Sequence, residues 1–93
     1  MSTHRFAINV TPKPGILDPQ GRAVEGSLGH LGIEGVSAVR VGRRVELTVE
    51  AADAEAAQAI VERLSSELLA NPLIEAYAIE PIAGASSIVS EAR

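Results

Sequence analysis

The order in which two hydrophobic periodicities alternate along the chain is the strongest constraint on its fold. Apolar residues recur at every second position in some segments and at helical spacing in others. The resulting order is strand, helix, strand, strand, helix, strand. This order predicts the α+β class and a ferredoxin-like βαββαβ sandwich, in which two helices cover one antiparallel sheet.

Four segments carry the strand pattern. In the first, 6–11, apolar residues alternate with smaller or polar ones, and a proline follows. Valines in 36–41 predict a second strand, which a tight turn at Gly42 and Arg43 joins to a third strand over 45–49. The last segment, 73–80, is apolar on both faces, so we expect both faces to be covered.

The first helix is expected to begin at Asp18 and Pro19. Aspartate is a favoured N-cap because its carboxylate accepts hydrogen bonds from free amides of the first turn, and proline fits the first helical position. Apolar residues follow at i, i+4 and i+7, and Gly32 can close the helix. These apolar residues are Val24, Leu28 and Leu31.

The two predicted helices differ in the intrinsic helix propensity of their residues. The second, from Asp53 to the stop at 71–72, is rich in alanine and glutamate. The first contains Gly21, Gly26 and Gly29, each of which costs roughly 0.5–1 kcal/mol relative to alanine. Tertiary packing must therefore hold the first helix, and close backbone approach is one reason for its glycines.

The length of 93 residues predicts a single domain over 1–82, followed by a flexible tail over 83–93. Hydrophobic residues make up 46% of the chain but aromatic residues only 2%, so aliphatic side chains must fill the core. Such a small core is modest, and we expect the chain to form oligomers.

Charge and residue usage exclude several function classes. The net charge of −4 disfavours binding to nucleic acid or to an anionic membrane. The absence of cysteine removes thiolate nucleophiles and metal ligands and favours the cytoplasm. His4 and His30 lack partners at the spacing of a metal site or a catalytic triad. We therefore predict no catalytic residue and no metal site.

The proline-rich segment 12–21 superficially resembles a phosphate-binding loop. Asp18 places a negative charge at the helix start and Pro19 removes an amide, so anion binding is disfavoured. Its rigidity suits another role, because a stiff loop that exposes Ile16 and Leu17 lowers the ordering cost of docking. Contact with a partner and folding of the loop onto its own sheet both remain open.

Several blocks of the sequence resemble, in order and spacing, the PurS family, the small subunit of phosphoribosylformylglycinamidine synthase. The most specific is 12–24, PKPGILDPQGRAV. Further blocks are LG at 31–32, VRVG at 39–42, VEL at 45–47 and LLANPLIEAY at 68–77. The resemblance spans about residues 5–80 and omits the tail.

The resemblance implies a place in de novo purine biosynthesis. The complex converts formylglycinamide ribonucleotide, ATP and glutamine into formylglycinamidine ribonucleotide, ADP, phosphate and glutamate. A large synthetase subunit binds ATP with Mg²⁺, and a glutaminase subunit releases ammonia with its own cysteine. The small subunit binds no cofactor alone, forms a homodimer or homotetramer, and bridges the other two.

Residues of the proline loop and of the last strand are the expected partner contacts, with the loop expected to meet the large synthetase subunit. The candidates are Lys13, Ile16, Leu17, Asp18, Gln20, Asn71, Glu75 and Tyr77.

A ligand-sensing module of the ACT type is the alternative, because it shares the strand–helix–strand repeat. In such a module Gly15 would lie beside a bound amino acid. The length agreement with the PurS blocks argues against it.

Overall fold

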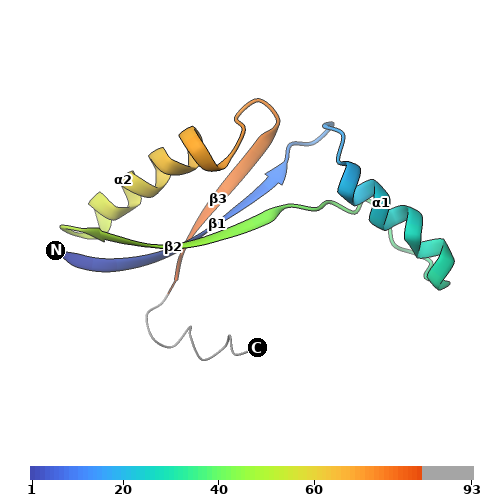
Figure 1. Ribbon diagram of the computed structural model, residues 1–93, viewed down its shortest axis with the longest axis horizontal. Helices are drawn as coiled ribbons and strands as arrows, with labels where there is room; N and C mark the ends of the chain where they lie inside the picture. Colours follow the sequence, from blue (N-terminus) through green and yellow to red (C-terminus); the bar gives the residue numbers. More distant parts are fainter. Residues whose placement is uncertain (83–93) are drawn as a thin grey trace.

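The structure is a computed structural model that describes residues 1–82, and it has the predicted α+β class (Figure 1). The predicted tail, 83–93, lies outside the described residues. In chain order the elements are β1 (Ser2–Pro12), α1 (Pro19–Leu28), a 3-10 turn η1 (Gly29–Leu31), β2 (Arg43–Ala51), α2 (Ala54–Leu64), a π-helical extension η2 (Ser65–Leu69) and β3 (Glu75–Ile82).

The three strands form one antiparallel sheet in the order β2-β1-β3. The central strand β1 is the most buried, because it pairs on both sides and carries the alternating apolar residues. Ile8 lies opposite Val45 on β2 and Ile79 on β3, which places all three on the same face of the sheet. The core of the molecule forms on this face.

Helix α2 closes the core by packing on β1 and β2. Asp53 caps it as predicted, its carboxylate accepting from the Ala56 amide at 2.8 Å. Ala57, Val61 and Ser65 follow at i, i+4 and i+8 and are all buried. The Ser65 hydroxyl donates to the Val61 carbonyl at 2.7 Å, so this polar group enters the core with its hydrogen bond made.

The predicted strand over 36–41 and its turn at Gly42 and Arg43 are wrong. The described sheet has three strands, and 36–41 is irregular backbone. Ala38 has a positive φ of 57°, which a strand does not allow. The Val39 and Val41 amides are satisfied by carboxylates from the helix side, at 2.8 Å each, rather than by a neighbouring strand.

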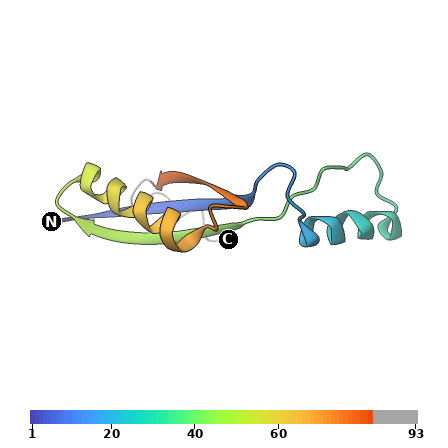
Figure 2. The ribbon, with the colours of Figure 1, turned by 90° about the horizontal axis from the view of Figure 1, so that it is seen from above.

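Within residues 1–82 only α2 covers the sheet, so the expectation that both helices do so is also wrong. Residues 13–42, which include α1, extend beyond the end of the sheet as an arm (Figures 1 and 2). The proline loop carries the chain onward from β1 instead of turning it back. Several apolar side chains of the arm are consequently exposed to solvent. They are Leu17, Val24, Leu31, Ile33 and Val36.

The base of the arm is held by hydrogen bonds to Asp18, which caps α1 as predicted. Its carboxylate accepts from the Gly21 amide at 3.0 Å and from the Val41 amide at 2.8 Å. These bonds, that from Val41 first, lower the pKa of Asp18 below its usual value. One carboxylate thereby joins the start of α1 to the segment that returns to the sheet.

Gly21 allows this close approach, which confirms one of the reasons expected for the glycines of α1. A Cβ atom at Gly21 would collide with the Val39 carbonyl oxygen and with Asp18 Oδ2. At Gly26 and Gly29 a Cβ atom would meet nothing within 4 Å. Close approach therefore explains the first glycine and not the other two.

We expect Gly21→Ala to loosen the arm. The added methyl group overpacks its base and should lower the free energy of unfolding by about 1–3 kcal/mol. Gly26→Ala is the matched control, because it places the same methyl group in open space and should stabilise α1 by about 0.5–1 kcal/mol. Thermal melts and hydrogen exchange at the Val41 amide measure both effects. Equal behaviour of the two variants would contradict this account of Gly21.

Candidate partner interface

A hollow of about 690 Å³ opens where the arm leaves the sheet. Apolar side chains from the end of β1, the proline loop, the return segment and the start of β3 line most of it. The hollow is lined by Val10, Pro12, Ile16, Leu17, Asp18, Pro19, Gln20, Val41, Gly42, Arg43, Ile74 and Glu75. Five of the eight predicted contact residues therefore meet in one place: Ile16, Leu17, Asp18, Gln20 and Glu75.

Lys13 fixes the proline loop against the segment before β3. Its amide donates to the Ile74 carbonyl at 2.8 Å, and its ammonium group donates to the Pro72 carbonyl at 2.7 Å. The Ile16 amide donates back to the Lys13 carbonyl at 3.1 Å and closes a turn. Leu17 is nevertheless 68% exposed, so the fixed loop presents an apolar side chain to solvent.

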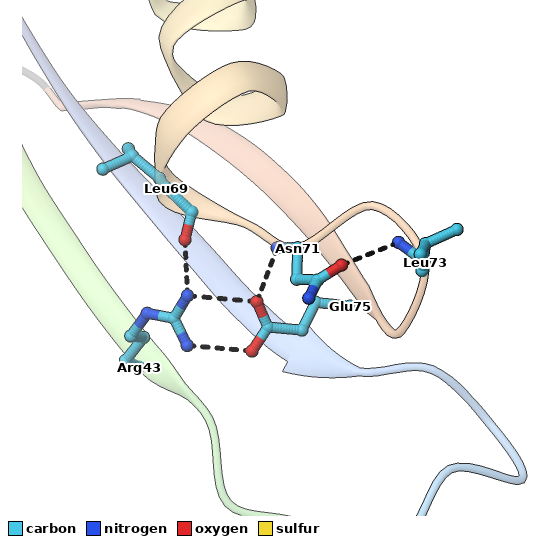
Figure 3. Close-up of polar contacts among 5 residues, drawn as sticks. All are labelled: Arg43, Leu69, Asn71, Leu73 and Glu75. Atoms are coloured by element: carbon cyan, nitrogen blue, oxygen red, sulfur yellow. Dashed lines mark hydrogen bonds and ion pairs between the residues drawn. The ribbon is translucent and has the colours of Figure 1, made fainter.

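Arg43 and Glu75 form a two-point ion pair beside the hollow (Figure 3). The guanidinium donates to the two carboxylate oxygens at 2.9 and 3.1 Å, and it also donates to the Leu69 carbonyl. Arg43 is the main cause of the lowered pKa of Glu75. The pair joins the start of β2 to the end of η2 and the start of β3.

Sequence reasoning missed this role of Arg43. It placed the residue in a turn, whereas the structure places it at the start of β2. Arginine and glutamate stand 32 positions apart in the chain, and no local pattern links them.

Asn71 organises the backbone of the loop 70–74. Its amide donates to Glu75 Oε1 at 2.8 Å, and its side-chain oxygen accepts from the Leu73 amide at 3.1 Å (Figure 3). Its carbonyl accepts from the Ile74 and Glu75 amides at 3.1 and 2.7 Å. The loop is thus fixed by its own hydrogen bonds, yet the Leu73 side chain remains 82% exposed.

Tyr77 lies outside the hollow. It stands on β3 opposite Val10, on the helix-bearing face of the sheet, and is 38% exposed. Since α2 packs on β1 and β2, part of the β3 face is left open to solvent.

Within 1–82 no group of three or more histidine, cysteine, aspartate or glutamate side chains could hold a metal ion. Over the same range, no buried polar side-chain atom lacks a hydrogen-bond partner. No helix in this part of the chain is both long and apolar enough to cross a membrane.

We expect the Arg43–Glu75 pair to make the stability of the loop depend on pH. The pKa of Glu75 is lowered in the folded chain, so its stabilising effect is complete above the ordinary value of 4.5 and is lost as the pH falls through the lowered pKa. Glu75→Gln should remove this acid-side change and speed hydrogen exchange at the Asn71 amide.

Glu62→Gln is the control for this measurement. The Glu62 carboxylate accepts from the Gln58 side chain on α2 and is remote from Arg43 in the hydrogen-bond network. The control should retain both the acid-side change and the slow exchange at Asn71. An unaltered pH profile in Glu75→Gln would show that the ion pair does not hold the loop.

Comparison with known proteins gives a consistent result. The family model PurS, phosphoribosylformylglycinamidine (FGAM) synthase, matches residues 5–83. The FGAM synthase subunit PurS of Synechocystis sp. is 47% identical over 78 residues, which cover 84% of this chain and 78% of that protein.

Solved structures extend the likeness to the fold. The purS subunit of FGAM synthase (EC 6.3.5.3) from Thermotoga maritima is 34% identical with a TM-score of 0.80, covering 87% of this chain and 93% of that one. A chain in the structure of PurLQS from the same organism is 35% identical with a TM-score of 0.81, covering 88% of this chain and all of that one. The comparisons give no support to the ACT-type alternative. The chain belongs to the PurS family of FGAM synthase.

Proposed function

We propose that this chain is the small, non-catalytic subunit that joins the large synthetase and glutaminase subunits of an FGAM synthase complex. The complex would use ATP, Mg²⁺ and glutamine to convert formylglycinamide ribonucleotide to formylglycinamidine ribonucleotide. This chain would bind none of these cofactors alone. The observation that carries the proposal is the likeness, over 88% of this chain, to a chain in the structure of PurLQS.

The chemistry of the described surface supports a binding role. The ionic groups around the hollow are already engaged: Lys13 with a carbonyl, Asp18 with two amides, and Arg43 with Glu75. A reacting group must be able to change its contacts during the reaction, whereas these groups hold the fold together. What the surface offers to other molecules is mainly apolar.

We also propose that the chain associates with itself, as a homodimer or homotetramer, and works in the cytoplasm. The exposed apolar residues of the arm and the open part of β3 support self-association, because a partner would remove them from water. The modest core, with one helix on three strands, supports it as well.

The proposal predicts that the purified chain alone shows no glutaminase, ATPase or amidotransferase turnover above background. Added to the large synthetase and glutaminase subunits, it should bind both and raise glutamine-dependent turnover. Pull-down and a coupled assay of ADP release measure the two effects. Turnover by the chain alone would overturn the proposal, and so would failure to bind one of the two subunits.

We expect Leu17→Ser to weaken binding of the large synthetase subunit by roughly tenfold, because burying a leucine contributes about 1.5–3 kcal/mol. Leu17 is more exposed than Ile16, at 68% against 37%, so it is the better placed of the two to meet a second protein. Titration by calorimetry gives the affinity.

Leu68→Ser provides the control, because Leu68 is 73% exposed on the η2 extension of α2 and does not line the hollow. Its affinity for the large subunit should match that of the unmodified chain. Circular-dichroism melts check that both variants fold. Unchanged affinity in a folded Leu17→Ser variant would move the contact elsewhere.

A further inference from the structure

We propose that Arg22 and Arg40 form a binding site for one carboxylate group, and that an aspartate or glutamate side chain of the large synthetase subunit occupies it in the assembled complex. The two arginines line a second, smaller pocket of the arm, with a volume of about 220 Å³, which we call the arginine pocket. The inference rests on the proposed function and adds to it a site of defined chemistry. The rest of the lining is Gly15, Ile16, Leu17, Asp18, Ala38 and Val39.

The guanidinium groups of the arginine pocket are available to an anion. Arg43, Arg44 and Arg63 each form an ion pair within the chain. By contrast, the side chains of Arg22 and Arg40 form neither a hydrogen bond nor an ion pair within residues 1–82. A guanidinium has five N–H donors in a planar fork that matches the two oxygens of a carboxylate. The two arginines without a partner therefore lie in one pocket and share the donors that a carboxylate site requires.

The charges in the arginine pocket favour a carboxylate over a phosphate group. Besides the two arginines, its lining carries the Asp18 carboxylate. The amides of Val41 and Gly21, and to a smaller extent Arg40, lower the pKa of Asp18, so this carboxyl group is ionised at neutral pH. Two positive charges and one negative charge leave one positive charge over. A single carboxylate neutralises it, whereas a phosphate dianion would exceed it and lie beside Asp18.

The backbone that carries the two arginines is fixed before a partner binds. Arg22 lies in the first turns of α1, and its amide donates to the Asp18 carbonyl at 2.9 Å. Arg40 lies between Val39 and Val41, whose amides each donate to a carboxylate at 2.8 Å. Because only the arginine side chains remain to be ordered, the entropy lost when a carboxylate binds is small.

A strained residue lies in the wall of the arginine pocket. Ala38 has a φ of 57°, a left-handed conformation that residues other than glycine rarely adopt. Such conformations persist where neighbouring contacts impose them, and they are concentrated at binding sites. Here Ala38 directly precedes Val39 and Arg40, in the segment that runs back beside α1 (Figures 1 and 2). This strain is an observation separate from the charges, and it favours the same pocket as a binding site.

The position of the arginine pocket indicates which protein supplies the carboxylate. Ile16 and Leu17 line both this pocket and the hollow, so the two sites share the proline loop. A protein that buries Leu17 therefore comes close to both arginines. Covering a guanidinium without an opposite charge is costly, because the charge loses its hydration. The large synthetase subunit, which the proposed function brings to Leu17, would avoid this cost by placing an acidic side chain between the arginines.

The first test removes both charges of the pocket and measures affinity for the large synthetase subunit by calorimetry. The double variant Arg22→Gln, Arg40→Gln should bind about tenfold more weakly at about 0.05 M salt, because it lacks both charge-assisted contacts. At about 0.5 M salt, screening weakens these contacts in the unmodified chain, so the difference should fall below about threefold. Arg63→Gln is the control, because Arg63 is an exposed arginine of α2 that does not line the pocket, and it should change the affinity by less than about twofold.

The outcomes separate this inference from the proposed function. If the unmodified chain binds the large synthetase subunit and the folded double variant binds it equally well at both salt concentrations, the carboxylate site is wrong while the proposed function stands. If the unmodified chain does not bind that subunit, both are wrong. If the double variant loses affinity for the glutaminase subunit instead, the assignment to the large subunit is overturned. Circular-dichroism melts check that the variants fold.

The second test identifies the carboxylate by cross-linking. A carbodiimide joins a lysine amine to a carboxylate that touches it, and the only lysine in this sequence is Lys13. Arg40→Lys keeps the positive charge and adds one amine in the pocket. In the mixture with the large synthetase subunit, we expect a new cross-link from position 40 to an aspartate or glutamate of that subunit, mapped by mass spectrometry. Arg63→Lys is the control, and a yield at position 40 no higher than at position 63 would overturn the proposal.

Discussion

Burial of β1 beneath α2 is the interaction on which the rest of the molecule depends. Phe6, Ile8 and Val10 supply one face of the core, and Ala57 and Val61 supply the other. Because the helix side chains at the contact are small, α2 can lie close to the sheet. Within residues 1–82 the core consists of this one helix packed on three strands, and it is therefore small. The arm and the loop before β3 are joined to this core by hydrogen bonds and ion pairs more than by packing.

Local chemistry was predictable from the sequence, whereas long-range pairing was not. Asp18 and Asp53 cap α1 and α2 as expected, because an N-cap depends on amides only two or three residues away. The strand predicted over 45–49 lies within β2. It was predictable because one buried face is enough to give the alternation of apolar and polar residues. The same reasoning failed at 36–41, where two carboxylates of the arm satisfy amides that a strand would otherwise use.

In the candidate interface, too, the local features were predictable and the long-range contacts were not. Five of the eight predicted residues line one hollow because the proline loop and the start of β3 meet there. Two of these residues also hold the fold together, because the carboxylates of Asp18 and Glu75 are hydrogen-bonded within the chain. Their predicted contact with a partner stays a prediction. Arg43, which holds Glu75, could not be found from the sequence, because the contact depends on how three separate elements meet.

Engagement of the charged groups determines what kind of interface this surface can form. Lys13, Asp18, Arg43 and Glu75 each hold a backbone segment in place, so their side chains are already hydrogen-bonded before any partner arrives. In the proposed interface, binding energy would then come mainly from apolar side chains, whose contribution depends little on salt. The fixed backbone lowers the entropy lost on association, and the exposed leucines supply the area to be buried. In the proposed interface the two features act together, because the rigid loops lower the entropy lost on binding and the apolar side chains supply the area that is buried.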